Sequence, residues 1–254
     1  MRRGATVLIA KLGLTLLLSQ GIAAVKASEI TVIASPGVAG VVSELSRQFE
    51  AANGHKILTD FAVVAVSKRK IDAGAPFDIA ILSPEAIGDL VRQGKIVTDT
   101  RTAFGRTGLG VVVRKGAAKP DVGTVEAFKK TILNANSVGH SKEGLSGVHF
   151  LASLDRLGIT SQMKPKLHAY EGRDMTRAVA TGEVELAVTG IGPIVATPEF
   201  DFVGPLPSEL QSYVVFMAGI SPNARDPEAT RALLQFMTAA AATPVFKAKG
   251  MERD

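Results

Sequence analysis

Short apolar runs alternate with amphipathic helical patterns along almost the whole chain of 254 residues. In the first such unit, an apolar run over 30–34 predicts a buried strand, and Ser35-Pro36-Gly37 interrupts it. Apolar residues then recur at a spacing of three and four, which predicts an amphipathic helix that ends at Gly54. A chain that repeats this strand–helix unit is expected to form an α/β fold with largely parallel strands.

The same patterns predict the other elements of the chain. Apolar runs predict strands over 56–61, 78–82, 108–113, 138–140, 167–170, 185–189 and 213–218. Periodic segments with capping residues predict helices over 84–93, 124–132, 145–157, 173–181, 226–238 and 244–249. No linker rich in proline or serine divides the chain into consecutive domains. If two lobes exist, the chain must therefore cross between them inside ordered strands.

Ser35 is the first candidate for a functional residue. It follows a strand and precedes a helix, so it combines a hydroxyl group with free backbone N–H groups and the positive end of a helix dipole. This combination predicts a binding site for a small anion.

The first 27 residues have the pattern of a secretory signal. Arg2 and Arg3 form a basic start, a mostly apolar segment follows, and small residues precede a predicted cleavage after Ala27. Lys11 leaves too short an uncharged stretch for a membrane-spanning helix. The chain has no cysteine, so it has neither a disulfide nor a lipid-modified cysteine anchor. We expect a freely diffusing periplasmic protein.

The high isoelectric point does not indicate a nucleic-acid partner. The formal net charge is +5, but residues 1–27 contain four basic residues and no acidic ones. The rest of the chain therefore carries a formal charge of +1. A charge this close to zero gives no indication that the protein binds nucleic acid.

The sequence lacks the groupings of residues that common catalytic and metal sites need. It has no cysteine nucleophile, no glycine-rich phosphate-binding loop, no G-x-S-x-G motif and no H-E-x-x-H motif. We therefore expect neither a catalytic residue, nor a metal, nor a cofactor, and predict that the chain is not an enzyme. Among the histidines, His140 is the candidate for a ligand contact, because it ends a predicted strand beside Ser141.

With these features in view, the sequence resembles the molybdate-type periplasmic solute-binding proteins of ABC importers. The resemblance rests on the order and spacing of segments such as ITVIASPGVAGVVSELSRQFEAANGHKI and KIDAGAPFDIAILSPEAIGDLVRQGKI. It continues through GRTGLGVVVRKGA, SGVHFLASLDRLGI, GRDMTRAVATGEVELAVTG and the closing segment that begins FMAGISPNARDPEATR.

The resemblance implies an α/β fold of the type II periplasmic-binding-protein class. Mixed sheets flanked by helices would form two lobes with a ligand cleft between them. The first lobe would hold residues 28–106 and 214–254, and the second lobe residues 107–213. The implied protein is a monomer that binds a small anionic ligand, closes around it by a hinge motion and docks on a membrane permease.

The family pattern also implies a set of ligand-binding residues. Ser35 matches the serine of the first turn, and backbone donors are expected around Ser146 and Met175. The second serine of the family is replaced by Val64, and the tyrosine that closes the site is replaced by Thr189.

The residues around the expected site do not fix the identity of the ligand. Val63 and Val66 extend the apolar wall around Val64, while His140, Lys142 or Arg173 are expected charge partners of an anion. The first expectation is a small oxyanion such as molybdate or tungstate, which would bind partly through backbone N–H donors. The alternatives are a small organic acid anion in the same role, or a ligand sensor or enzyme on the same fold.

Overall fold

The computed structural model describes residues 27–171 and 174–253. The predicted signal segment lies outside the described residues up to position 26, and cleavage after Ala27 stays a prediction. No helix within the described ranges has both the length and the apolar character that crossing a membrane requires.

The described residues form nine strands. They are β1 (Glu29–Ala34), β2 (Lys56–Phe61), β3 (Ile79–Leu82), β4 (Thr102–Arg114), β5 (Val138–Ser141), β6 (Leu167–Tyr170), β7 (Leu186–Gly190), β8 (Phe200–Pro205) and β9 (Tyr213–Ile220). The α-helices are α1 (Ala39–Asn53), α2 (Val64–Asp72), α3 (Pro84–Arg92), α4 (Val125–Asn134), α5 (Leu145–Arg156), α6 (Thr160–Met163), α7 (Asp174–Thr181), α8 (Ile191–Val195), α9 (Pro227–Thr238) and α10 (Thr243–Ala248). Short 3₁₀ helices are η1 (Pro36–Val38), η2 (Thr98–Thr100), η3 (Lys164–Lys166) and η4 (Ala240–Ala242).

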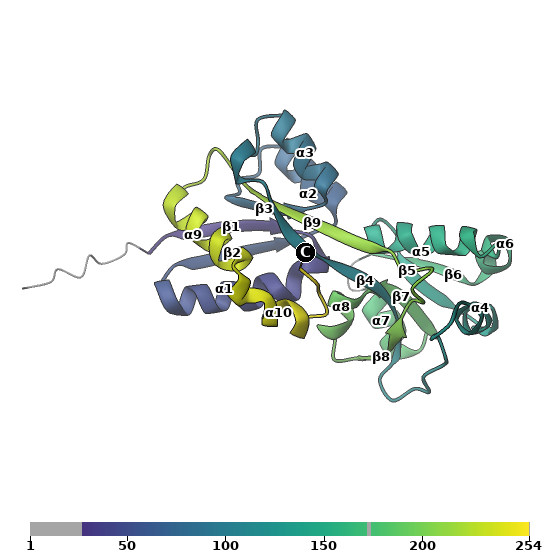
Figure 1. Cartoon of the computed structure of the whole chain (residues 1–254). Coiled ribbons are helices and arrows are strands. Elements are labelled where there is room, and N and C mark those ends of the chain that lie inside the picture. The colour runs from purple at the N-terminus through teal and green to yellow at the C-terminus, as the bar shows by residue number, and fades with distance from the viewer. Residues whose placement is uncertain (1–26, 172–173, 254) are drawn as a thin grey trace, which may run out of the picture.

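The strands form one curled sheet with two parallel parts (Figure 1). The order is β2-β1-β3-β9-β4-β7-β5-β6, and β8 pairs with β4. Strands β1, β2 and β3 are mutually parallel, as are β5, β6 and β7, whereas β4, β8 and β9 pair in the antiparallel sense. The prediction of mixed sheets flanked by helices is confirmed, and the expectation of a largely parallel sheet holds only within each half.

The long strand β4 joins the two halves of the sheet. Its residues 102–108 pair with β9, and its residues 109–114 pair with β7 and β8. The chain therefore crosses from the first half (β1, β2, β3 and β9) to the second half (β5 to β8) inside an ordered strand. It returns through the segment between β8 and β9 (Figure 1).

Both faces of the first half are buried. Alternate side chains of a strand point to opposite faces. Val32 of β1 accordingly packs in a cluster with Leu45 of α1 and Leu233 of α9. Its neighbour Ile33 packs in another cluster with Ile87 of α3. Because helices cover both faces, the strand reads as a continuous apolar run instead of an alternating one.

The second half repeats this arrangement with its own cores. Val111 of β4 packs with Phe128 of α4 and Phe150 of α5. Val112 packs on the other face with Val179 of α7 and Ile194 of α8. We propose that the two lobes correspond to these halves, with residues 28–106 and 214–254 in the first and residues 107–213 in the second.

Several elements differ from the sequence-based expectation. Strand β4 begins six residues before the predicted run 108–113, because residues 102–107 pair with β9 although they mix polar and apolar side chains. Strand β8 and the helices α2, α6 and α8 are not among the predicted segments. Helix α8 has five residues with Pro193 at its centre, which is too short to show a helical period.

Candidate ligand-binding site

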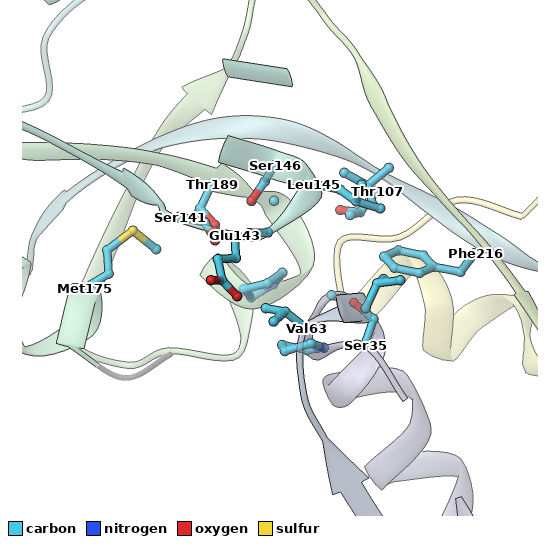
Figure 2. Close-up of a pocket in the computed structure, with 17 residues that line it drawn as sticks. Ser35, Val63, Thr107, Ser141, Glu143, Leu145, Ser146, Met175, Thr189 and Phe216 are labelled. Carbon is cyan, nitrogen blue, oxygen red and sulfur yellow. Dashed lines mark hydrogen bonds between the residues drawn. The ribbon is translucent and has the colours of Figure 1, made fainter. Parts of the chain in front are cut away.

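A cavity of about 170 Å³ lies between the two halves of the sheet. Its walls are the residues that follow the carboxyl ends of β1, β2, β5 and β7, together with residues of β4 and β9. This edge of parallel strands is the usual place for ligands in α/β folds. Figure 2 shows side chains from both halves around the same space. The lining consists of Ser35, Pro36, Gly37, Val63, Val64, Thr107, Ser141, Glu143, Gly144, Leu145, Ser146, Met175, Thr189, Gly190, Pro193, Val214 and Phe216.

Ser35 lies where β1 ends and the 3₁₀ turn η1 leads into α1. Its amide donates a hydrogen bond to the carbonyl of Ile81 at 2.9 Å, which fixes its backbone against β3. Its side chain makes no capping hydrogen bond to the helix that it precedes. The hydroxyl group is therefore free to serve a ligand in the cavity that Ser35 lines.

The start of α2 supplies an apolar wall. Val63 precedes the helix without a side-chain cap, and Val64 is its first residue. Both line the cavity, and Phe216 of β9 and Leu145 of α5 add further apolar surface. The hydroxyl that the family pattern expects at Val64 is replaced by methyl groups.

The loop between β5 and α5 is held tightly in place. The hydroxyl of Ser141 accepts a hydrogen bond from the amide of Gly144 at 2.9 Å. A Cβ atom at Gly147 would lie 1.9 Å from the carbonyl oxygen of Ser141, so only glycine permits this close approach. The constrained loop presents Glu143 and Ser146 to the cavity.

Thr107 and Thr189 place two further hydroxyl groups in the lining. The hydroxyl of Thr107 accepts a hydrogen bond from the amide of Gly192 and donates one to the carbonyl of Gly250, both at 3.1 Å. It thereby connects the start of α8 to the C-terminal segment across β4. Thr189 lies near the end of β7, and Met175 of α7 completes this side of the cavity.

The helices that begin at the cavity lack the side-chain caps that α3, α4 and α9 have, although α6 and α10 also begin without one. Helices α3, α4 and α9 begin away from it, and the side chains of Ser83, Thr124 and Asp226 cap their first turns. The helices that begin at the cavity, namely α2, α5 and α1 through η1, have no side-chain cap. Their first N–H groups and their positive dipole ends are therefore left for an anion.

The part of the cavity lining that the structure describes contains no positively charged side chain. Among the lining residues that the structure describes, Glu143 is the only charged one. Lys142 lies outside the lining and pairs with Glu171 at 3.0 Å, a hydrogen bond that raises the pKa of Lys142. Positive potential in the described part of the cavity therefore comes from helix starts. Within the described ranges, no three His, Asp or Glu side chains form a group that could hold a metal ion.

The structure brings most of the predicted residues together. Five of them line the cavity: Ser35, Val64, Ser146, Met175 and Thr189. His140 lies outside the lining, because it shares a face of β5 with Val138 and packs toward α5. Its ring centroid is 6.1 Å from that of Phe150, and its Nδ1 atom is 2.9 Å from the carbonyl oxygen of Ser141. Arg173 lies outside the described residues.

The sequence did not point to several of the lining residues, among them Glu143, Thr107 and Phe216. Glu143 lies between a predicted strand and a predicted helix, and this position at a strand end would have been sufficient to suggest it. Thr107 and Phe216 come from within β4 and β9. Only the long-range pairing of these two strands brings them to the cavity, so no local pattern identifies them.

An α/β fold with two cores, and a cavity between them surrounded by uncapped helix starts, is the architecture of the periplasmic solute-binding proteins. The chain belongs to the bacterial extracellular solute-binding protein family, whose model matches residues 30–252. The resemblance to molybdate-type binding proteins is thereby confirmed at the level of the family and the fold.

The known relatives carry different functions. An aconitate isomerase from a Pseudomonas species is 29% identical over 240 residues, which cover 91% of this chain and 90% of that protein. The molybdate-binding protein ModA of Azotobacter vinelandii is 26% identical over 233 residues, which cover 89% and 91%. The solved structure of the periplasmic molybdate-binding protein from Azotobacter vinelandii has a TM-score of 0.75 at 17% identity. The match covers 89% of this chain and 99% of that one, and shows the shared fold.

Proposed function

We propose that the chain is the solute-binding component of a bacterial ABC importer and that its ligand is a small organic acid anion. The observation that carries this proposal is the convergence of uncapped helix starts on a cavity with largely apolar walls. The N–H groups at these starts would replace the water molecules around a carboxylate. Val63, Val64 and Phe216 would contact the carbon skeleton of the ligand.

An organic acid suits this cavity better than a bare tetrahedral oxyanion. All the oxygens of an oxyanion need hydrogen-bond donors, and each unmet contact costs about 1–3 kcal/mol. Val64 supplies no hydroxyl in place of the second serine, and Thr189 is shorter than the tyrosine that it replaces. A carboxylate needs donors at one end only, and Val63, Val64 and Phe216 offer apolar surface to the rest of an organic acid.

In this role the protein would work in the periplasm after cleavage of residues 1–27. The two lobes would close around the ligand, and the closed form would dock as a monomer on the permease of the importer. Membership of the solute-binding family supports this sequence of events.

A thermal-unfolding screen of the chain from Ser28 onward tests the proposal. The panel contains lactate, malate, succinate, citrate, aconitate, molybdate, tungstate, sulfate and phosphate. A ligand at 100 times its dissociation constant stabilises the folded state by about 2.7 kcal/mol, a melting-temperature rise of roughly 5–10 °C in a protein of this size. We expect such a rise with a carboxylate. A rise with molybdate or tungstate and with no carboxylate would return the assignment to an oxyanion.

The second candidate function is isomerisation of aconitate. It is favoured by the 29% identity to an aconitate isomerase and by Glu143, a carboxylate in the lining that is able to accept a proton. Incubation of the purified protein with trans-aconitate, followed by chromatography for cis-aconitate, tests it. If the wild-type protein converts aconitate and Glu143→Gln does not, the function is enzymatic and the receptor function is replaced. Binding of a carboxylate without turnover would favour the receptor.

A further inference from the structure

Glu143 places a negative charge in the cavity that we propose for an anion. It lies in the loop between β5 and α5, and Figure 2 shows its carboxylate directed into the space between Ser141 and Val63. No lysine, arginine or histidine occurs among the described lining residues, so none of those side chains neutralises it there. Lys142 interacts electrostatically with Glu143, but it lies outside the lining, where its ammonium group is hydrogen-bonded to Glu171. A second carboxylate close to Glu143 would be repelled.

The position of Glu143 gives the cavity two different ends. The residue directly precedes Gly144, the N-cap of α5, where a negative charge interacts favourably with the helix dipole. The start of α5 thus has its own acidic partner. The starts of α2 and of α1, which lie across the cavity, have no acidic residue in their first turns. A ligand anion is expected at this second end, beside Ser35.

We propose that Glu143 determines ligand specificity by accepting a hydrogen bond from the ligand, so that the ligand class is a hydroxy acid. This inference rests on the proposed function as a carboxylate receptor. The carboxylate of the ligand lies at Ser35 and the starts of α1 and α2, and its hydroxyl group donates to Glu143. A hydrogen bond to a charged acceptor corresponds to a preference of about ten- to hundredfold over the same acid without the hydroxyl group.

Calorimetric titration with matched acids tests this specificity. The pairs are lactate and propionate, malate and succinate, and citrate and tricarballylate, each titrated into the chain from Ser28 onward. Wild-type protein should prefer the hydroxy acid by about tenfold or more in the pair that binds best. Glu143→Ala should reduce this preference to within about twofold and should bind the plain acid more tightly. Glu143→Gln keeps an acceptor without the charge and should give an intermediate preference.

Glu126→Gln is the matched control, because it removes a carboxylate from the start of α4, away from the cavity. It should leave both affinities unchanged. An unchanged preference in Glu143→Ala, or a wild-type protein that binds both acids of every pair equally, would overturn the role of Glu143 while leaving the receptor function intact. If no carboxylate binds to the wild-type protein, the proposed function itself fails.

Discussion

Ser35 and Ser83 form a matched pair, since each follows a strand of the same sheet and precedes a proline that begins a helix. The hydroxyl of Ser83 accepts a hydrogen bond from the amide of Ala86 at 3.3 Å and caps α3. The side chain of Ser35 has no capping role and lines the cavity instead. The two serines should therefore respond in opposite ways to replacement by alanine.

Ser83→Ala should lower the free energy of unfolding by about 1 kcal/mol, because it removes a helix cap. It should leave ligand affinity unchanged. Ser35→Ala should lower the free energy of unfolding by less than Ser83→Ala does, because the Ser35 hydroxyl makes no capping hydrogen bond. Loss of a hydrogen bond to a charged ligand costs about 1.5–3 kcal/mol, so Ser35→Ala should weaken binding about ten- to hundredfold.

Urea denaturation of the ligand-free proteins measures the first effect. Calorimetric titration with the carboxylate that gives the largest thermal shift measures the second. Equal affinity of wild-type protein and Ser35→Ala would remove Ser35 from the site. A loss of stability in Ser35→Ala as large as that in Ser83→Ala would refute the assignment of a free hydroxyl.

Three further substitutions test other parts of the structure. Val64→Ser restores a hydroxyl at the start of α2 and should raise molybdate affinity about tenfold in calorimetry; unchanged affinity would separate this position from the ligand. Gly147→Ala forces a Cβ atom against the carbonyl of Ser141. It should lower the free energy of unfolding, measured by urea denaturation, by about 1–3 kcal/mol and should also weaken ligand binding. A neutral effect would contradict the close packing of this loop. Hydrogen bonds from the Ser28 hydroxyl and from the start of α9 lower the pKa of Asp226. Their contribution to stability is present above the unfolded carboxyl pKa near 3.9 and is lost as the pH falls through the lower folded value, so Asp226→Asn should show a smaller loss of stability on acidification.

The sequence predicted the elements whose signals are local. The apolar run at 30–34, the break after it and the helix that ends at Gly54 correspond to β1, η1 and α1. Ser35 could be selected because its position relative to this strand and this helix is visible within a few residues. The strands β1, β2, β5 and β7, whose carboxyl ends meet at the cavity, were predictable for the same reason.

The parts that could not be predicted depend on long-range pairing. The first half of β4 is a strand because β9 pairs with it from more than a hundred positions away, and this pairing brings Thr107 and Phe216 to the cavity. The orientation of His140 depends on which face of β5 meets α5, and the sequence of β5 alone does not define that face. Glu143 differs from these residues, because its position after a predicted strand was visible in the sequence and was overlooked only for lack of a periodic pattern in the loop.

The most direct test of the central claim is a crystal structure of the chain from Ser28 onward with the carboxylate that gives the largest thermal shift. We expect the carboxylate group within hydrogen-bond distance of the Ser35 hydroxyl, beside the first turns of α1 and α2, and the carbon skeleton against Val64. A carboxylate bound outside the cavity, or a tetrahedral oxyanion found in the cavity in place of the acid, would contradict the proposed binding of an organic acid at Ser35.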